Sequence, residues 1–223
     1  MKFSILIANY NNGKFFKDCY HSIIDQSFTE WEAVILDDAS TDNSLEVISA
    51  LIKDDIRFKI YKNDKNSGVG ITKSKLIELA NGNLCGFVDP DDAITPNALQ
   101  SAMDVFIKDQ QTVLTYSSFM KCDEYLKPVE QFKSGMQVIN NDPFFFNCPV
   151  HIVHFVCFRK NIYEQTEKMN SEMRIAEDQD LYLKMYEKGK VKYINEPNYL
   201  YRAHSGGISQ NENLPKSREY FAR

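Results

Sequence analysis

The sequence predicts an α/β protein with a mostly parallel central sheet flanked by helices, in a single domain of residues 1–223. First, short apolar runs alternate four times with amphipathic helical stripes over about ninety residues, as in strand–helix–strand units. Second, turn-forming or acidic residues follow the first, second and fourth runs. Third, the composition of 43% hydrophobic and 26% charged residues excludes disordered, collagen-like and coiled-coil chains.

The apolar runs are short and nearly continuous, which is typical of strands covered on both faces. Four strands are expected in the first part of the chain, at Phe3–Ala8, Trp31–Leu36, Phe58–Tyr61 and Leu84–Val88. Between them, apolar residues recur at three- and four-residue spacings, the pattern of a helix with one buried face. These helices are expected at Phe15–Ser27, Ser44–Ile52 and Ile71–Ala80.

The rest of the chain is less regular. After an expected helix at Asn97–Lys108 and a strand at Thr112–Phe119, prolines and glycines interrupt the pattern up to residue 150. Order returns with expected strands at His151–Arg159, Val191–Ile194 and Tyr199–Arg202 and a helix at Glu177–Lys188. We therefore divide the domain into a regular half, residues 1–119, and a less regular half, residues 120–223.

The charge balance and the cysteines bear on partners and location. Lys and Arg total 26 against 31 Asp and Glu, a net charge of -5, which argues against a nucleic-acid partner because such proteins need a basic face. Five cysteines without metal-finger spacing favour a reduced, cytoplasmic compartment. The sequence shows no signal-peptide pattern and no apolar stretch of about 18 residues, so the expected membrane contact is at most peripheral.

Three short clusters hold nine of the acidic residues: Asp37, Asp38 and Asp42; Asp89, Asp91 and Asp92; Glu177, Asp178 and Asp180. The first two clusters follow expected strands, and ligands of open α/β sheets bind beyond the carboxyl ends of the strands. The third cluster opens a helix. It either offsets the helix dipole or supplies a general base, and the residues alone leave both interpretations open.

Asp89-Pro90-Asp91-Asp92 is the strongest single feature. Three carboxylates within four residues repel one another unless a cation neutralises them, and hard oxygen ligands at this density suit Mg²⁺ or Mn²⁺. A solvated turn before a helix explains the same residues equally well. A haloacid-dehalogenase-type phosphatase also places two such acids after a strand, but its usual Thr or Val is here Ala93.

Two weaker motifs complete the set. Asn66-Ser67-Gly68-Val69-Gly70 resembles a phosphate-binding loop only weakly, although Lys73 on the following helix can reach a phosphate. Tyr201-Arg202-Ala203-His204 is a polar stretch suited to phosphate or metal binding. For each motif alone, a plain turn or a structural histidine is the simpler interpretation.

Together these segments resemble the family 2 glycosyltransferases with the GT-A fold, over roughly Lys2 to Ser209. The resemblance is carried by an ordered series of motifs: Ser4 to Asn11; Ser22-Ile23 with Gln26-Ser27-Phe28; Asp37 to Asp42; Asn66-Ser67-Gly68; Ala80-Asn81-Gly82; Phe87 to Asp92; Glu177 to Leu181; and Tyr201 to His204. The resemblance implies a nucleotide-diphosphate sugar as donor, with a UDP-sugar favoured over other nucleotide sugars. It also implies a glycan or lipid-linked glycan as acceptor.

The resemblance also implies roles for single residues. Tyr10 would stack on the base and Asp38 would hydrogen-bond it; Asp89 would contact the ribose or donor sugar. Asp178 would deprotonate the acceptor hydroxyl, with inversion at the anomeric carbon. The other implied residues are Ala8, Asn9, Asp37, Gly68, Lys73 and Asp91 for donor binding; Asp91, Asp92 and His204 for Mn²⁺ or Mg²⁺; and Glu177, Asp180 and Arg202 in support.

The sequence departs from the family pattern at several points. Ala8-Asn9 displaces the usual Thr or Ser, and Lys73-Ser74 replaces the usual Arg-Asn. The signature of processive synthases is absent, which favours single transfer of a sugar. Residues 1–119 would form the nucleotide-sugar-binding half and residues 120–223 the acceptor-side half. Phe144–Phe146 and His151–Phe155 are expected to line the acceptor side or belong to the core. A sugar nucleotidyltransferase and an inactive nucleotide-sugar-binding module remain alternatives, as does a chain that is a fragment of a longer protein.

Overall fold

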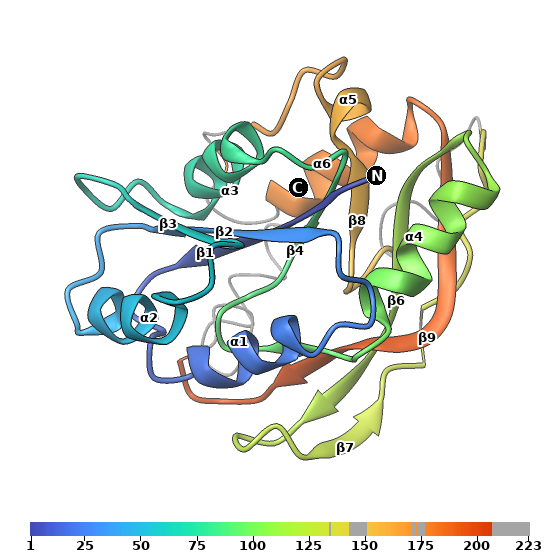
Figure 1. Cartoon of the computed structure of the whole chain (residues 1–223). Coiled ribbons are helices and arrows are strands. Elements are labelled where there is room, and N and C mark those ends of the chain that lie inside the picture. The colour runs from blue at the N-terminus through green and yellow to red at the C-terminus, as the bar shows by residue number, and fades with distance from the viewer. Residues whose placement is uncertain (134, 143–150, 171–172, 174–176, 207–223) are drawn as a thin grey trace.

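The computed structural model describes residues 1–133, 135–142, 151–170, 173 and 177–206 (Figure 1). Its centre is one sheet with the strand order β3-β2-β1-β4-β8-β6-β9-β5, and β7 pairs with β6 at the side. The strands are β1 (Phe3–Asn9), β2 (Trp31–Asp37), β3 (Phe58–Lys62), β4 (Leu84–Phe87), β5 (Ala93–Ile94), β6 (Thr112–Cys122), β7 (Pro128–Gln131), β8 (Cys157–Arg159) and β9 (Lys190–Arg202).

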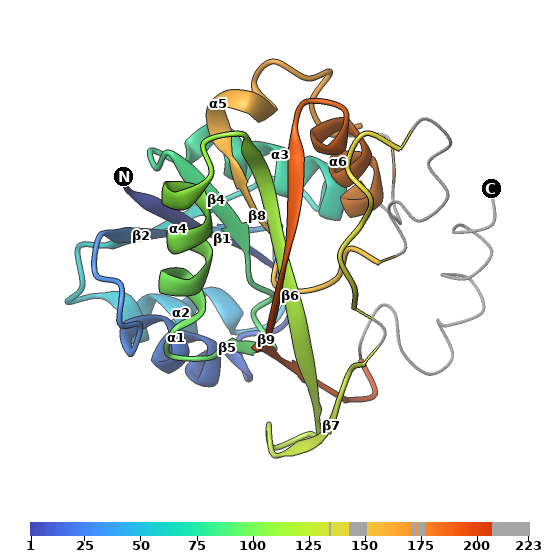
Figure 2. The same ribbon diagram turned by 90° about the vertical axis from the view of Figure 1, so that its right-hand side faces the viewer.

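Helices cover both faces of the sheet. Figure 1 shows α1 and α2 on one side of β1–β3 and α3 on the other, and Figure 2 shows α4 and α6 on opposite sides of β6 and β9. The helices are α1 (Phe16–Ile24), α2 (Ser44–Ile52), α3 (Val69–Leu79), α4 (Ala98–Lys108), α5 (Lys160–Tyr163) and α6 (Glu177–Tyr186).

The apolar runs of β1, β2 and β4 are continuous because each of these strands contributes side chains to two cores. In β1, Phe3, Ile5 and Ile7 join the cluster that α1, α2 and α4 complete, whereas Leu6 joins the cluster under α3, α5 and α6. Successive side chains of a strand point to opposite faces, so both faces must be apolar when both are covered.

The parallel strands bring their carboxyl ends to one edge of the sheet. β2, β1 and β4 are neighbours and parallel, and Asn9 at the end of β1 pairs with Asp37 at the end of β2. The segment after β4, Asp89–Asp92, leaves from the same edge. The predicted fold class, with its mostly parallel sheet, is confirmed. Two of the acidic clusters follow β2 and β4 at the same edge of the sheet.

Some boundaries were predicted wrongly. The strand expected from His151 begins only at Cys157, because the Ser117 hydroxyl, and not a neighbouring strand, bonds the main chain of His154 and Phe155. The two strands expected at the end of the chain form one, β9, since a bulge opposite Ser117 and Ser118 absorbs the residues before Pro197. The short elements β5, β7 and α5 were not predicted, and Phe144–Phe146 lies outside the described residues.

The opposite edge of the sheet is held by a buried carboxylate. Glu32 in β2 accepts hydrogen bonds from Lys2 Nζ (3.0 Å), Lys59 Nζ (2.9 Å), Ser4 Oγ (2.7 Å) and the Asn81 N–H (2.6 Å). Burial alone would raise the pKa of Glu32, but these bonds, led by that of Lys59, hold it at about 2. The carboxylate therefore stabilises the fold in its ionised form.

We expect Glu32→Gln to reduce the free energy of unfolding at pH 7 by about 2–3 kcal/mol. This loss is smaller than that expected on breaking a fully buried ion pair, because Lys2 and Lys59 are both half-exposed. A depressed folded-state pKa contributes stability that is complete above the ordinary pKa of 4.5 and is lost as pH falls towards 2. Urea unfolding at several pH values measures both effects. Glu30→Gln, at an exposed position, is the matched control; equal losses in the two variants would contradict the assignment.

Candidate active site

One buried carboxylate ties together the loops that follow β1 and β2. Asp37 is fully buried, and its Oδ1 accepts hydrogen bonds from Asn9 Nδ2 (2.7 Å) and Ser40 Oγ (2.5 Å). Its Oδ2 accepts the N–H of Ser40 at 2.9 Å. These bonds fix the main chain around Ala8 and Asn9, and the neighbouring Tyr10 leaves 44% of its surface exposed at the rim.

The adjacent carboxylate organises a second loop. Asp38 accepts hydrogen bonds at Oδ1 from Asn63 Nδ2 (2.7 Å) and the Ser67 N–H (2.9 Å), and at Oδ2 from the Gly68 N–H (2.8 Å). Gly68 has φ +88°, a left-handed conformation that glycine adopts without strain, directly before α3. The predicted donor residues Tyr10, Asp38 and Gly68 therefore lie on neighbouring loops of one edge.

The acidic loop after β4 is fastened to β9. The N–H of Asp89 donates to Tyr199 Oη (3.1 Å), and Asp92 Oδ1 accepts the N–H of Arg202 (2.8 Å). Asp92 is buried, whereas Asp89 and Asp91 are half-buried. The shape of this loop thus depends on a strand that is 110 residues later in the chain.

Asp91 lies against the histidine that follows β9. Its Oδ2 is 2.7 Å from His204 Nε2, and its main-chain oxygen accepts a hydrogen bond from Arg202 Nε (2.6 Å). The His204 ring packs on Phe15 with a centroid distance of 4.6 Å. The structure therefore brings together two of the three predicted metal ligands.

Arg202 joins four segments around this pair. Besides its bonds to the acidic loop, its Nη1 donates to the main-chain oxygen of Glu124 (2.6 Å) and its Nη2 to Asp18 Oδ2 (2.7 Å). Its side chain is only 3% exposed and lies over the Phe15 ring. The predicted supporting residue Arg202 is thus a buried junction between β9, the acidic loop, α1 and the turn before β7.

The third acidic cluster lies at the start of α6. Asp178 Oδ1 accepts the N–H of Gln179 (2.9 Å), and Glu177 forms an ion pair with Lys73 of α3 (2.7 Å). Asp180 points elsewhere: its Oδ2 accepts bonds from the Asn170 N–H and Lys184 Nζ, both at 2.8 Å. The ammonium of Lys73 thus contacts Glu177 here, and its predicted contact with a diphosphate stays a prediction.

The acids of the loop and of α6 form one electrostatic centre. Burial raises the pKa of Asp89, Asp92 and Asp178 above the ordinary value, and for Asp89 and Asp178 the ammonium of Lys73 is the strongest influence in the other direction. Burial lowers the pKa of His154, against the opposing effect of Asp89 and Asp178. Carboxylates from two distant parts of the chain thus act on the same lysine and the same histidine.

The residues present fit a divalent cation in part. Asp91 and His204 offer one hard oxygen and one imidazole, which suit Mn²⁺ when phosphate oxygens and water complete the coordination. The Asp92 carboxylate accepts the N–H of Arg202 instead. Within the described ranges, no three side chains of His, Cys, Asp and Glu converge as a preformed metal site. Binding of Mn²⁺ or Mg²⁺, and the share of Asp92 in it, stay predictions.

Sequence reasoning missed two residues of this centre. Tyr199 bonds the acidic loop from β9, and His154 stacks on Tyr199 with a centroid distance of 4.7 Å and an interplanar angle of 17°. A tyrosine in an apolar strand looks like a core residue, so nothing in the sequence marked Tyr199. His154 did leave a signal, as a polar side chain within the apolar run His151–Phe155.

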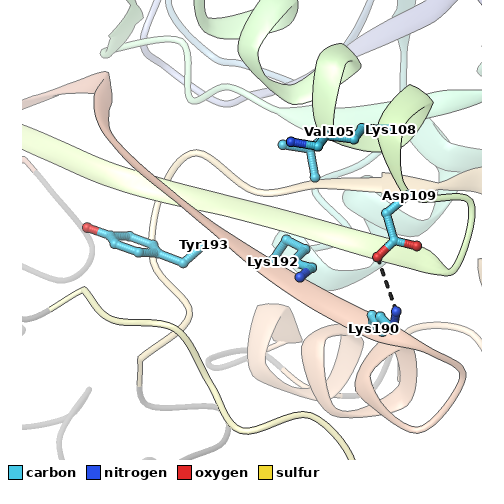
Figure 3. Close-up of a pocket in the computed structure, with 6 residues that line it drawn as sticks. All are labelled: Val105, Lys108, Asp109, Lys190, Lys192 and Tyr193. Carbon is cyan, nitrogen blue, oxygen red and sulfur yellow. Dashed lines mark hydrogen bonds and ion pairs between the residues drawn. The ribbon is translucent and has the colours of Figure 1, made fainter.

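A cavity of about 450 Å³ lies far from the acidic centre (Figure 3). It opens between the end of α4 and the start of β9, where Lys190 pairs with Asp109 at 3.3 Å. Ten residues of β9 separate Lys192 from Arg202, a span of about 30 Å at the rise of a strand. Its lining residues, Val105, Lys108, Asp109, Lys190, Lys192 and Tyr193, therefore lie outside the candidate active site.

Comparison with known protein families shows to which family the chain belongs. The family model described as Glycosyl transferase family 2 matches residues 4–166. The chain belongs to glycosyl transferase family 2. The matched range contains the loops after β1, β2 and β4 but ends before Asp178 and His204. The resemblance drawn from the sequence motifs is confirmed.

Similar proteins of this family are larger or of comparable size. The chain is 29% identical to chondroitin synthase of Escherichia coli over 86% of its own length and 28% of that protein. It is 25% identical to TuaG of Bacillus subtilis (strain 168) over 98% of its length and 85% of that protein. Among solved structures, residues 1–349 of S. aureus TarS in complex with UDP-GlcNAc match with a TM-score of 0.79 and 21% identity, over 98% of this chain and 64% of that one.

This structural likeness confirms the GT-A fold of the family 2 chain. No helix in the described part of the chain is long and apolar enough to cross a membrane. The positions of the predicted site residues are now known, whereas their roles stay predictions.

We expect Arg202→Met to lower the free energy of unfolding by about 3 kcal/mol, because a buried charge network loses its centre. Arg57→Met is the control, since it removes a partly exposed ion pair with Asp55 and is expected to cost at most about 1 kcal/mol. Urea unfolding of both variants measures the difference. A loss at Arg202 no larger than that at Arg57 would show that the junction does not stabilise the fold.

Proposed function

We propose that the chain transfers a sugar from a UDP-sugar to a hydroxyl group of a glycan or lipid-linked glycan, with inversion at the anomeric carbon. The observation that carries this proposal is that Lys73 and His154 influence the charges of both Asp178 and Asp89, which follows β4 at the same sheet edge as the loops after β1 and β2. Family membership and the UDP-GlcNAc complex of the structurally similar TarS support it.

The donor nucleotide is proposed to lie on the loops after β1 and β2. Tyr10 offers an exposed ring on which a base can stack, and Asp38 and Gly68 lie on neighbouring loops that are hydrogen-bonded to each other. The hydrogen bond between Asn9 and Asp37 holds the loops after β1 and β2 together. Asp89, at the end of β4, is the acid proposed to contact the ribose or the donor sugar.

The diphosphate is proposed to lie at the acidic loop, where Asp91 and His204 would hold Mn²⁺ or Mg²⁺. When bound, such an ion stabilises the charge of the leaving diphosphate. Arg202 keeps Asp91 in place through the main chain, and Phe15 supports the ring of His204. Because the surrounding carboxylates repel an anionic donor, donor binding is expected to depend on the cation.

Asp178 is the proposed general base. Its carboxylate accepts the proton of the acceptor hydroxyl while that oxygen forms its bond to the anomeric carbon and the bond to the diphosphate oxygen breaks. Attack from the face opposite the leaving group inverts the configuration. Burial raises the pKa of Asp178 above its ordinary value, and the ammonium of Lys73 opposes that effect by favouring the ionised carboxylate.

A reducing, cytoplasmic location is part of the proposal. In the described part of the chain, Cys19, Cys85, Cys122 and Cys157 are buried free thiols, which suits a compartment that keeps cysteines reduced. We propose at most a peripheral contact with a membrane that carries a lipid-linked acceptor. The net charge of -5 supports the expectation that nucleic acid is not a partner.

For the cation, we expect Mn²⁺ to strengthen binding of UDP-GlcNAc by about tenfold or more, equivalent to about 1.4 kcal/mol. Asp91→Asn should remove most of that gain, because the variant loses a charged oxygen ligand. Titration calorimetry with and without Mn²⁺ measures both, with GDP- and TDP-sugars as further donors. Asp104→Asn on α4 is the control and should behave as wild type. Donor affinity that ignores Mn²⁺ in every case would refute the cation's role.

For the base, we expect Asp178→Asn to lower turnover by a factor of about 10²–10⁴ while donor affinity stays within about twofold. UDP release from a panel of UDP-sugars, with water and with glycan acceptors, measures turnover. Glu187→Gln, exposed just past α6, is the matched control. Full turnover in the Asp178 variant would overturn its role, and absence of turnover in the wild type with every donor would favour the inactive binding module.

A further inference from the structure

Helix α3 and the start of α6 meet in a buried ion pair. Lys73 Nζ lies 2.7 Å from Glu177 Oε1, and the two side chains are only 13% and 8% exposed. Lys73 also lies over the ring of Phe87, with its Nζ 5.4 Å from the centroid. The pair joins residues 104 positions apart in the chain, so it links two separate parts of the fold.

A second contact lies one turn earlier on the same face of α3. A Cβ atom on Gly70 would be 2.6 Å from the main-chain oxygen of Met173 and 3.7 Å from the Cβ of Glu177. Real side chains do not approach a backbone oxygen so closely, so only glycine permits this packing. Positions 70 and 73 are three residues apart and therefore face the same neighbour. Helix α3 thus approaches Met173 closely at Gly70, and it pairs with Glu177 in the first turn of α6 through Lys73.

We propose that Lys73 is a positioning residue that sets the place of Asp178 through Glu177, and that Gly70 supports this by its close contact with Met173. This inference rests on the proposed role of Asp178 as general base. Glu177 and Asp178 are consecutive residues in the first turn of α6, so a fixed Glu177 side chain fixes the main chain of Asp178. The described bond of the Asp178 carboxylate is to the N–H of the next residue, within its own helix.

The ion pair favours this role over a direct contact with the diphosphate. A lysine that turned to a phosphate would leave the carboxylate of Glu177 buried without its partner, which is costly for a group of 8% exposure. Lys73 also favours the ionised form of Asp178, which the burial of that acid opposes. The same ammonium therefore serves both the placement and the charge of the proposed base.

The two roles predict different kinetics. A positioning residue acts on the chemical step, and a misplacement of the reacting group by about 1 Å costs on the order of 10² in rate. We therefore expect Lys73→Met to lower kcat by roughly that factor with the donor KM nearly unchanged. Lys73→Arg, which keeps the charge and the reach to Glu177, should restore most of the rate. Gly70→Ala should lower kcat in the same manner because it displaces the main chain at Met173.

Lys184→Met is the matched control. Lys184 pairs with Asp180 at 2.8 Å on the same helix, with exposures of 19% and 20%, but this pair joins residues within α6. The control should therefore keep the wild-type kcat. UDP release from the UDP-sugar that gives the highest turnover measures the kinetics. Hydrogen exchange of residues 177–186 gives a readout without activity, and exchange should rise in Lys73→Met but not in Lys73→Arg.

Each outcome decides between the inferences. A raised donor KM with unchanged kcat in Lys73→Met would make Lys73 a donor ligand and overturn the proposal, as would unchanged kcat, KM and exchange. An equal loss of kcat in Lys73→Met and Lys184→Met would show a general effect on α6 and would overturn the positioning role of Lys73. Full turnover in Asp178→Asn would instead refute the general base itself. An inactive Asp178→Asn beside a fully active Lys73→Met would leave the proposed function intact and refute only the positioning role.

Discussion

Repulsion among carboxylates at the carboxyl edge of the sheet is the constraint on which the site depends. Parallel strands deliver Asp89, Asp91 and Asp92 to one place, and α6 adds Asp178. Acids that are partly removed from water cannot remain together unless positive groups or hydrogen-bond donors oppose their charge. Lys73 of α3 opposes the charge of Asp89 and Asp178, the Arg202 N–H of β9 donates to Asp92, and His204 after β9 lies against Asp91. Distant parts of the chain are therefore needed to balance the negative charge of these carboxylates.

This balance of charge explains why the less regular part of the chain matters to a site that the regular part outlines. β9 supplies Tyr199 and Arg202, and His204 follows it directly. Arg202 further reaches Asp18 in α1 and the main chain of Glu124. A strand at one side of the sheet thus holds the acidic loop that leaves its centre. The division into a donor half and an acceptor half stays a prediction, but the centre described above draws on both.

The sequence was informative where local pattern and topology agree. Apolar strands followed by Asp37 and by Asp89 predicted both the sheet and the edge at which the acids meet, because parallel strands share a direction. It was uninformative at His154, where the Ser117 hydroxyl bonds the main chain in place of a neighbouring strand. It was also uninformative in β9, where a bulge joins two apolar runs into one strand. It also could not show that Lys73 faces Glu177, since an ion pair across 104 residues leaves no local pattern.

The pair Asp37-Asp38 has a consequence for how such a site changes over time. The first carboxylate bonds Asn9 and Ser40, and the second bonds Asn63 and the main chain before α3. Each loop is thus held by its own acid, although the two acids are neighbours in the chain. A change in one loop therefore leaves the carboxylate contacts of the other loop in place. Under the proposed function, the preference for a donor could then change one loop at a time while the sheet stays the same.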